Sequence, residues 1–148
     1  MWESNAVPTA GATHPGTLDR DECLRLLSKG VVGRAIFTEA ALPTALPVCY
    51  LLDGEEIIFC APAASKLAST AAQHAVVAFQ ADDIDPHTHT GRSVLGVGQA
   101  HPVTDPDRLT KLAQHPPTAR ALADTAHAIA IPLQRLTGQH LNLNGQAS

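Results

Sequence analysis

The chain has 148 residues, enough for one domain with a substantial core. Apolar residues make up 45% and charged residues 16%, which excludes a disordered or highly charged protein. The formal net charge is -4 and the Lys and Arg residues form no cluster, so we expect no nucleic-acid partner. No stretch approaches the ~20 apolar residues of a membrane helix, so we expect no membrane partner either.

Composition along the chain predicts one ordered domain between two flexible ends. Residues 1–16 mix Pro, Gly, Ala, Ser and Thr without periodicity, as in a flexible leader. Residues 17–143 are expected to form the single domain, and residues 144–148 a flexible tail. The first residues have neither the basic nor the apolar segment of a secretory signal.

Three cysteines, Cys23, Cys49 and Cys60, have no metal-ligand spacing and leave one unpaired in any disulfide scheme. Their apolar neighbours favour an interpretation as inert core residues. With the missing signal, this pattern predicts a reducing cytoplasm as the location.

The first predicted element is a helix that begins after Leu18. Asp19 is a suitable N-cap, and Glu22 follows three residues later as in a capping box. Apolar residues from Cys23 onwards form one face, and Gly30 is a natural end.

Strand patterns follow. Residues 31–38 form the first, 40–43 turn the chain, and 44–52 form the second. The Asp53-Gly54 pair predicts a two-residue hairpin with positive φ at both positions. The remaining expected elements, in chain order, are a strand at 55–61, a helix from Ser65, a strand at 75–81, a loop at 87–91, a strand at 93–103, a helix from Asp105-Pro106, a helical turn at 118–124, a strand at 126–131 and a last strand pair or extended tail at 133–141.

The order of these elements predicts the architecture. Most strands are joined as sequential hairpins, so the sheet is expected to be antiparallel. About six strands with short helices between them predict a mainly β fold, a closed or split six-stranded barrel. Gly96 and Gly98 in the long strand permit a bend or a close backbone approach.

Ser65 and Lys66 are the first candidates for chemistry. Backbone N–H groups at the start of a helix, with a hydroxyl and an ammonium, can bind a phosphate. Alternatively, Ser65 is only an N-cap and Lys66 a solvated charge. Arg34 lies in an otherwise apolar strand, so its guanidinium must reach water, a carboxylate or an anionic ligand.

Two histidines near an acidic segment raise the question of a metal site. His87 and His89 lie near Asp82, Asp83 and Asp85, but a site there needs a third converging ligand. We therefore favour a solvated loop and assign no metal site. No Ser/His/Asp or Cys/His nucleophile pattern is present, so no catalytic residue is assigned.

Several short motifs in a fixed order point to a family. They are Cys23-Leu24-x-Leu26-Leu27, Val32-Gly33-Arg34, Leu46-Pro47-Val48-x-Tyr50, Ile58-Phe59, Ser65-Lys66-Leu67, Val77-Ala78-Phe79-x-x-Asp82-Asp83-Ile84-Asp85, Gly91-x-Ser93-Val94-Leu95-x-x-Gly98 and Ile131-Pro132 leading to Thr137-Gly138. From about Leu18 to Leu141 the chain resembles the actinobacterial branch of the pyridoxamine-5′-phosphate-oxidase-like family, with its FMN-binding split barrel.

The resemblance implies a homodimer with two flavin sites at the subunit interface. Ser65 and Lys66 would hold the flavin phosphate, with Arg34 as a helper. The implied ring-binding residues are Pro47, Val48, Cys49 and Tyr50 along the isoalloxazine, with Phe59, Cys60 and Ala61 lining the same pocket.

This sequence differs from the family pattern at three places. Ala64 replaces the usual Gly before Ser-Lys, and its Cβ would crowd a loop that needs positive φ. Arg92 replaces a common Trp and offers a cation to an anionic ligand or a reduced flavin. The turn between the first two strands lacks the usual Gly. These differences leave the fold intact and bear on flavin affinity.

Three functions remain open. The first is an FMN-dependent oxidoreductase acting on a small molecule, in which the cofactor carries the electrons. The second is an F420-dependent reductase, whose acidic tail would need Lys66, Arg92 and Arg34. The third is a protein without enzymatic activity: a flavin- or haem-binding protein, or a dimer without a cofactor.

Overall fold

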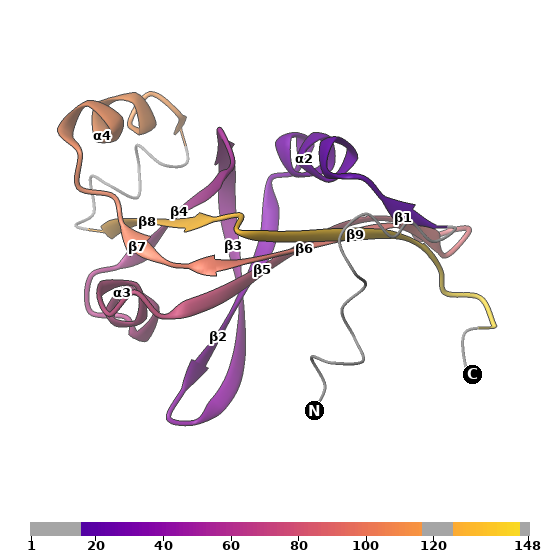
Figure 1. Cartoon of the computed structure of the whole chain (residues 1–148), viewed down its shortest axis with the longest axis horizontal. Coiled ribbons are helices and arrows are strands. Elements are labelled where there is room, and N and C mark those ends of the chain that lie inside the picture. Colours follow the sequence, from indigo (N-terminus) through magenta and orange to yellow (C-terminus); the bar gives the residue numbers. More distant parts are fainter. Residues whose placement is uncertain (1–15, 117–125, 146–148) are drawn as a thin grey trace.

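The computed structural model of the chain describes residues 16–116 and 126–145. Within these ranges, one antiparallel sheet curls into a partly closed barrel that carries short helices (Figure 1). The strand order is β1-β9-β6-β5-β2-β3-β4-β8-β7. The predicted leader and tail lie mostly outside the described residues, and the expected turn at 118–124 lies wholly outside them.

The described part of the chain contains nine strands where the sequence predicted six. Two of the additional strands, β1 and β7, are two residues long, too short for a periodic pattern. The bounds are β1 (Thr17–Leu18), α2 (Arg20–Lys29), β2 (Val32–Glu39), β3 (Leu42–Asp53), β4 (Glu56–Pro62), α3 (Lys66–Ala72), β5 (Val76–Asp85), β6 (Thr90–Gln99), β7 (His101–Pro102), α4 (Pro106–Leu112), β8 (Ala126–Pro132) and β9 (Arg135–Asn142).

Helix α2 begins with the predicted capping box. The Glu22 N–H donates to the Asp19 carboxylate over 2.8 Å, and the Asp19 N–H donates back to the Glu22 carboxylate over 3.0 Å. The helix buries Cys23, Leu26 and Leu27 against the barrel. The prediction for this helix is confirmed.

The barrel closes where the predicted strand 93–103 divides. The chain leaves β6, passes Ala100 and continues as β7 along β8, at the other end of the strand order. Gly98 permits this crossing, because a Cβ there would lie 1.8 Å from the carbonyl oxygen of Pro132. The predicted close backbone approach is therefore present.

Two tight turns connect the first three long strands. The β2–β3 turn is Ala40-Ala41, and both residues have positive φ, 52° and 65°. The β3–β4 hairpin is present, but the prediction placed it one residue early. Its loop is Gly54-Glu55, only Gly54 has positive φ, and Asp53 pairs with Glu56 in the ladder.

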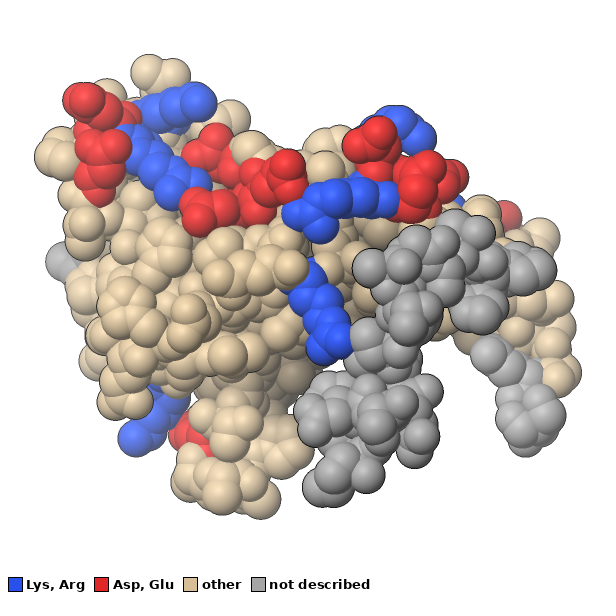
Figure 2. All heavy atoms as spheres, in the orientation of Figure 1, with Lys and Arg blue, Asp and Glu red and all other residues tan. Residues whose placement is uncertain are grey.

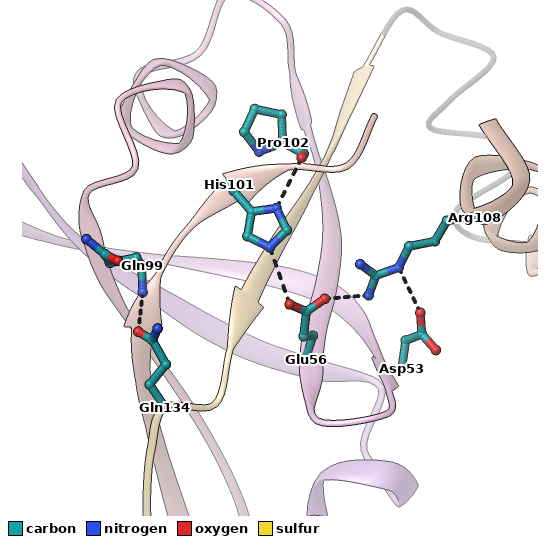
Figure 3. Close-up of polar contacts among 7 residues, drawn as sticks. All are labelled: Asp53, Glu56, Gln99, His101, Pro102, Arg108 and Gln134. Atoms are coloured by element: carbon teal, nitrogen blue, oxygen red, sulfur yellow. Dashed lines mark hydrogen bonds and ion pairs between the residues drawn. The ribbon is translucent and has the colours of Figure 1, made fainter. Parts of the chain in front are cut away.

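Ion pairs tie two helices to the β3–β4 hairpin. Arg108 of α4 donates to Asp53 over 2.9 Å and pairs with Glu56 over 2.6 Å, and Glu56 also faces the His101 ring (Figure 3). Arg20 of α2 pairs with Glu55. Figure 2 shows the resulting band of mixed charge over α4 and α2.

The core has two parts, one on each face of the sheet. The larger fills the barrel interior, whereas the smaller lies beneath α4. No helix in the described ranges is long and apolar enough to span a bilayer. The smaller cluster consists of Ile58, Val103, Leu112, Ala128 and Ala130, with Leu51, Cys60 and Leu109 packed against it.

Candidate functional site

Strand β3 changes partner halfway along its length, and this change opens a cavity. Residues 42–49 pair with β2, whereas residues 50–53 pair with β4. Tyr50 and Phe59 form the last β3–β4 pair, so the two strands part beyond them. A cavity of about 490 Å³ lies at this split, within the ~300–1,000 Å³ typical of small-molecule and cofactor sites.

The lining of this cavity is mostly apolar and comes from four parts of the chain. It includes seven of the eleven predicted cofactor residues. The lining residues are Gly30, Val31, Leu46, Pro47, Val48, Cys49, Tyr50, Leu51, Cys60, Ala61, Pro62, Ser65, His115 and Pro116.

His115 and Pro116 were missed by the sequence analysis. They follow α4, and the ion pairs described above hold that helix over the β3–β4 hairpin. The only local signal at these positions is that of a helix end, so no pattern could have placed them at the cavity.

Ser65 lies at the cavity, and its hydroxyl keeps a free donor. The Ser65 Oγ accepts the Ala68 N–H over 3.1 Å, as an N-cap does, which leaves the hydroxyl hydrogen available to a ligand oxygen. Lys66 is exposed and is outside the cavity lining. Ala64 does not have positive φ, so the loop does not require the glycine that the family usually has.

Tyr50 forms part of the cavity wall. Its hydroxyl donates to the Leu27 carbonyl over 2.8 Å, which joins β3 to the end of α2. Its ring meets Phe79 edge to face, with centroids 4.7 Å apart. Burial raises the pKa of Tyr50 to about 12, so the phenol stays protonated at neutral pH.

The interpretation of all three cysteines as core residues is wrong for one of them. Cys23 is buried as expected, but Cys49 is exposed and Cys60 is only partly buried. Cys49 and Cys60 both line the cavity. Burial raises the pKa of the Cys60 thiol. Alternation alone did not reveal this, because the sequence does not show where β3 and β4 part.

Arg34, Phe59 and Arg92 do not line this cavity. Arg34 is exposed on the outer face of the sheet, where it pairs in register with Pro47 and Gln80. Phe59 is only 2% exposed and points into the barrel core.

Arg92 lies 3.7 Å from Asp83 and lines a second cavity of about 240 Å³. Gly30 and Tyr50 separate this cavity from the first, because both residues line both. Lys29 also faces the second cavity.

Among the described residues, no three His, Cys, Asp or Glu side chains gather in a way that could hold a metal ion. His87 and His89 are exposed in the β5–β6 loop, and His89 has positive φ. The absence of a metal from the working protein stays a prediction.

A curled antiparallel sheet whose strands part around an apolar cavity defines a split-barrel protein. Residues 19–140 match the family described as Pyridoxamine 5′-phosphate oxidase, and the chain belongs to that family. The match includes α2, the cavity strands and the Ser65-Lys66 segment.

Relatives extend the comparison. The uncharacterized protein Rv0080 of Mycobacterium tuberculosis is 40% identical over 118 residues, 76% of this chain and 77% of that protein. The FAD-binding protein of Mycobacterium smegmatis superposes with a TM-score of 0.70 at 25% identity, covering 87% of this chain and 99% of the other. A FAD-binding protein of Mesorhizobium loti superposes with a TM-score of 0.72 at 18% identity, covering 85% of this chain and 97% of the other. The split-barrel fold is therefore confirmed.

Proposed function

We propose that this protein binds FMN in the cavity between β3 and β4 and serves as an oxidoreductase for a small molecule. The observation that carries the proposal is the cavity itself, which opens where β3 changes partner and is lined by Pro47, Tyr50, Cys60 and Ser65. Membership of the family and the similarity to FAD-binding proteins support a flavin. A bound flavin supplies reversible electron transfer to or from a small molecule.

The residues present fit a flavin. The apolar walls from Leu46 and Val48 suit a flat ring, and the peptide groups of residues 46–50 offer polar contacts at its edge. The Ser65 hydroxyl has a hydrogen to donate to a phosphate oxygen. Lys66 follows it directly, and its exposed side chain is free to turn toward the same phosphate.

Binding titrations test this proposal. Purified protein is titrated with FMN, FAD, F420 and haem, and binding is followed by quenching of flavin or deazaflavin fluorescence or by the haem absorbance. We expect FMN to bind more tightly than F420 and haem. Tighter binding of F420 would favour the reductase alternative, and binding of no cofactor would favour the cofactor-free dimer.

Lys66→Gln isolates the phosphate contact. We expect about a tenfold loss of FMN affinity, because a charge-assisted hydrogen bond contributes roughly 1.5 kcal/mol. Riboflavin, which lacks the phosphate, should bind the variant and the parent equally. Arg25→Gln, which removes an exposed positive charge from α2, is the matched control and should leave both affinities unchanged. Equal losses for FMN and riboflavin would contradict a phosphate contact.

We also propose that the protein is a homodimer that pairs through the outer face of its sheet. Ile36, Ala78 and Val97 form one cross-strand row on β2, β5 and β6. Leu95 is 39% exposed in the neighbouring row. The side chains of the cross-strand row are half-buried in the single chain, and a second copy packed on them would remove their remaining apolar surface from water.

Sedimentation tests the homodimer. We expect the parent protein to sediment as a dimer and Leu95→Glu as a folded monomer, because the carboxylate would be buried at the interface. A parent protein that is monomeric at every concentration would contradict the proposal.

The cytoplasmic location also stays a proposal, which cell fractionation tests.

A further inference from the structure

Two cysteines lie where the β3–β4 ladder ends. Tyr50 and Phe59 are the last paired residues, so Cys49 and Cys60 occupy the next position on each strand. Cross-strand neighbours project from the same face of a sheet, and both cysteines do line the same cavity. Both are free thiols.

A covalent link requires the β3–β4 ladder to extend by one residue pair. Opposed residues in an antiparallel ladder have Cα atoms about 4.5–5.5 Å apart. A disulfide accepts Cα separations of about 4.4–6.8 Å, so one further step of the β3–β4 ladder brings the pair within range. Cys23 lies on the buried face of α2, packed against Gly138 of β9, and takes no part.

We propose that Cys49 and Cys60 form a reversible disulfide across the mouth of the cavity, with a peroxide as the oxidant. The two thiols have different roles. Cys49 is exposed and meets the oxidant first, whereas Cys60 is partly buried and stays protonated, since burial raises its pKa.

The chemistry balances with hydrogen peroxide. The Cys49 sulfur attacks one peroxide oxygen, the O–O bond breaks, and the leaving hydroxide takes the Cys49 proton to form water. The Cys60 sulfur then attacks the sulfenic sulfur of Cys49. The S–O bond breaks as the S–S bond forms, and the hydroxide leaves with the Cys60 proton. In total, two thiols and one peroxide give one disulfide and two waters.

The disulfide would extend the β3–β4 connection by one position and narrow the split. The oxidised protein should therefore admit a ligand to the cavity less readily than the reduced protein. This consequence rests on the proposed function, but the disulfide itself does not.

The test begins with the fully reduced protein and hydrogen peroxide, followed by intact mass measurement and thiol titration in denaturant. We expect the mass to fall by two hydrogens and the thiol count to fall from the three cysteines of the chain to one. Peptide mapping should find Cys49 joined to Cys60, and dithiothreitol should restore all thiols.

Single substitutions make the test specific. Cys23→Ser should form the link as the parent protein does. Cys49→Ser and Cys60→Ser should not, and Cys60→Ser should accumulate a sulfenic acid at Cys49 that dimedone traps. Circular dichroism checks that each variant is folded. An unchanged thiol count, a link that includes Cys23, or a link only between two chains would each overturn the proposal.

FMN titration of the oxidised and reduced protein measures the consequence for the cavity. We expect weaker binding to the oxidised form, and equal binding would overturn the claim that the disulfide narrows the site. If neither form binds FMN, the proposed function fails. The disulfide is tested separately, because the intact mass of the protein shows whether it forms.

Discussion

Tyr50 is the residue that connects the helix, the barrel core and the cavity. Its hydroxyl binds the Leu27 carbonyl and its ring packs on Phe79. We expect Tyr50→Phe to lower the free energy of unfolding by about 1 kcal/mol, because one buried hydrogen bond is lost while the ring stays. Urea unfolding measures this change. A loss of about 3 kcal/mol or more, as for removal of a whole buried aromatic ring, would contradict the prediction.

The pH dependence of stability provides a second test of Tyr50. Its pKa is about 12 in the folded protein and about 10 when unfolded. Between these two pH values the folded state holds the phenol proton more firmly than the unfolded state does. The contribution of Tyr50 to the free energy of unfolding is therefore complete below pH ~10 and is lost as the pH rises toward 12. The chain has one tyrosine, so its phenolate absorbance reports this group alone. A midpoint near 10 in the folded protein would contradict its burial.

At the level of single residues, the features predicted correctly are those formed between residues close in the sequence. The Asp19–Glu22 capping box and the Ser65 N-cap each join residues three positions apart, and both are present. The exposure of Cys49 and the position of Phe59 in the core could not be predicted from the sequence. Both depend on which face of an apolar strand borders the split, and apolar residues occupy both faces.

The β2–β3 turn has a strained backbone at two consecutive residues. Ala40 and Ala41 both have positive φ, which costs an alanine roughly 1–2 kcal/mol. We expect Ala41→Gly to stabilise the protein by about 0.5–1 kcal/mol, because relief of this strain exceeds the greater entropy of glycine in the unfolded chain. Thermal unfolding measures the change.

Ala45→Gly is the matched control for the turn. Ala45 is exposed in β3, next to the same turn but with ordinary strand geometry. There the glycine should destabilise the protein by about 0.5–1 kcal/mol. If both substitutions change stability in the same direction, the strain at Ala41 is disproved.

The attachment of α4 depends on Arg108. Burial lowers the pKa of this guanidinium, but the hydrogen bonds that it donates to Glu56 and Asp53 raise the pKa overall, so it stays charged. Arg108→Gln leaves two carboxylates, each about a quarter exposed, without their main cation. We expect a loss of about 1–2 kcal/mol in urea unfolding, less than for a fully buried pair.

The Arg108 variant should also loosen His115 and Pro116 at the cavity, because they directly follow α4. Arg25→Gln on α2 removes an exposed charge and should change stability by less than about 0.5 kcal/mol. Equal effects of the two substitutions on the free energy of unfolding would mean that the ion pairs of Arg108 do not stabilise the protein.

At the level of elements, the chain order of strands and helices was predictable because turns and caps are local. The two shortest strands were not, since β1 and β7 exist only through their partners β9 and β8. The hairpin loop at Gly54-Glu55 was placed one residue early for a different reason. The Asp-Gly signal shows that a turn is present, whereas the register of the ladder, in which Asp53 pairs with Glu56, decides which two residues form its loop.

The closure of the whole barrel depends on Gly98. We expect Gly98→Ala to destabilise the protein by about 3 kcal/mol, at the upper end for overpacking, because the atom in the way is the backbone carbonyl oxygen of Pro132. Gly96→Ala is the control, since its methyl meets the Leu133 side chain, which can move. Urea unfolding should show the smaller loss for Gly96→Ala, and the reverse order would contradict this closure.

The central claim is that the cavity between β3 and β4 holds a flavin. A crystal structure of the protein grown with FMN tests it most directly. We predict difference density for the ring along residues 46–50, with Cys60 and Ala61 beside it and the phosphate at Ser65 and Lys66. Density for FMN at another surface, or an unoccupied cavity in protein that binds FMN in solution, would contradict the account.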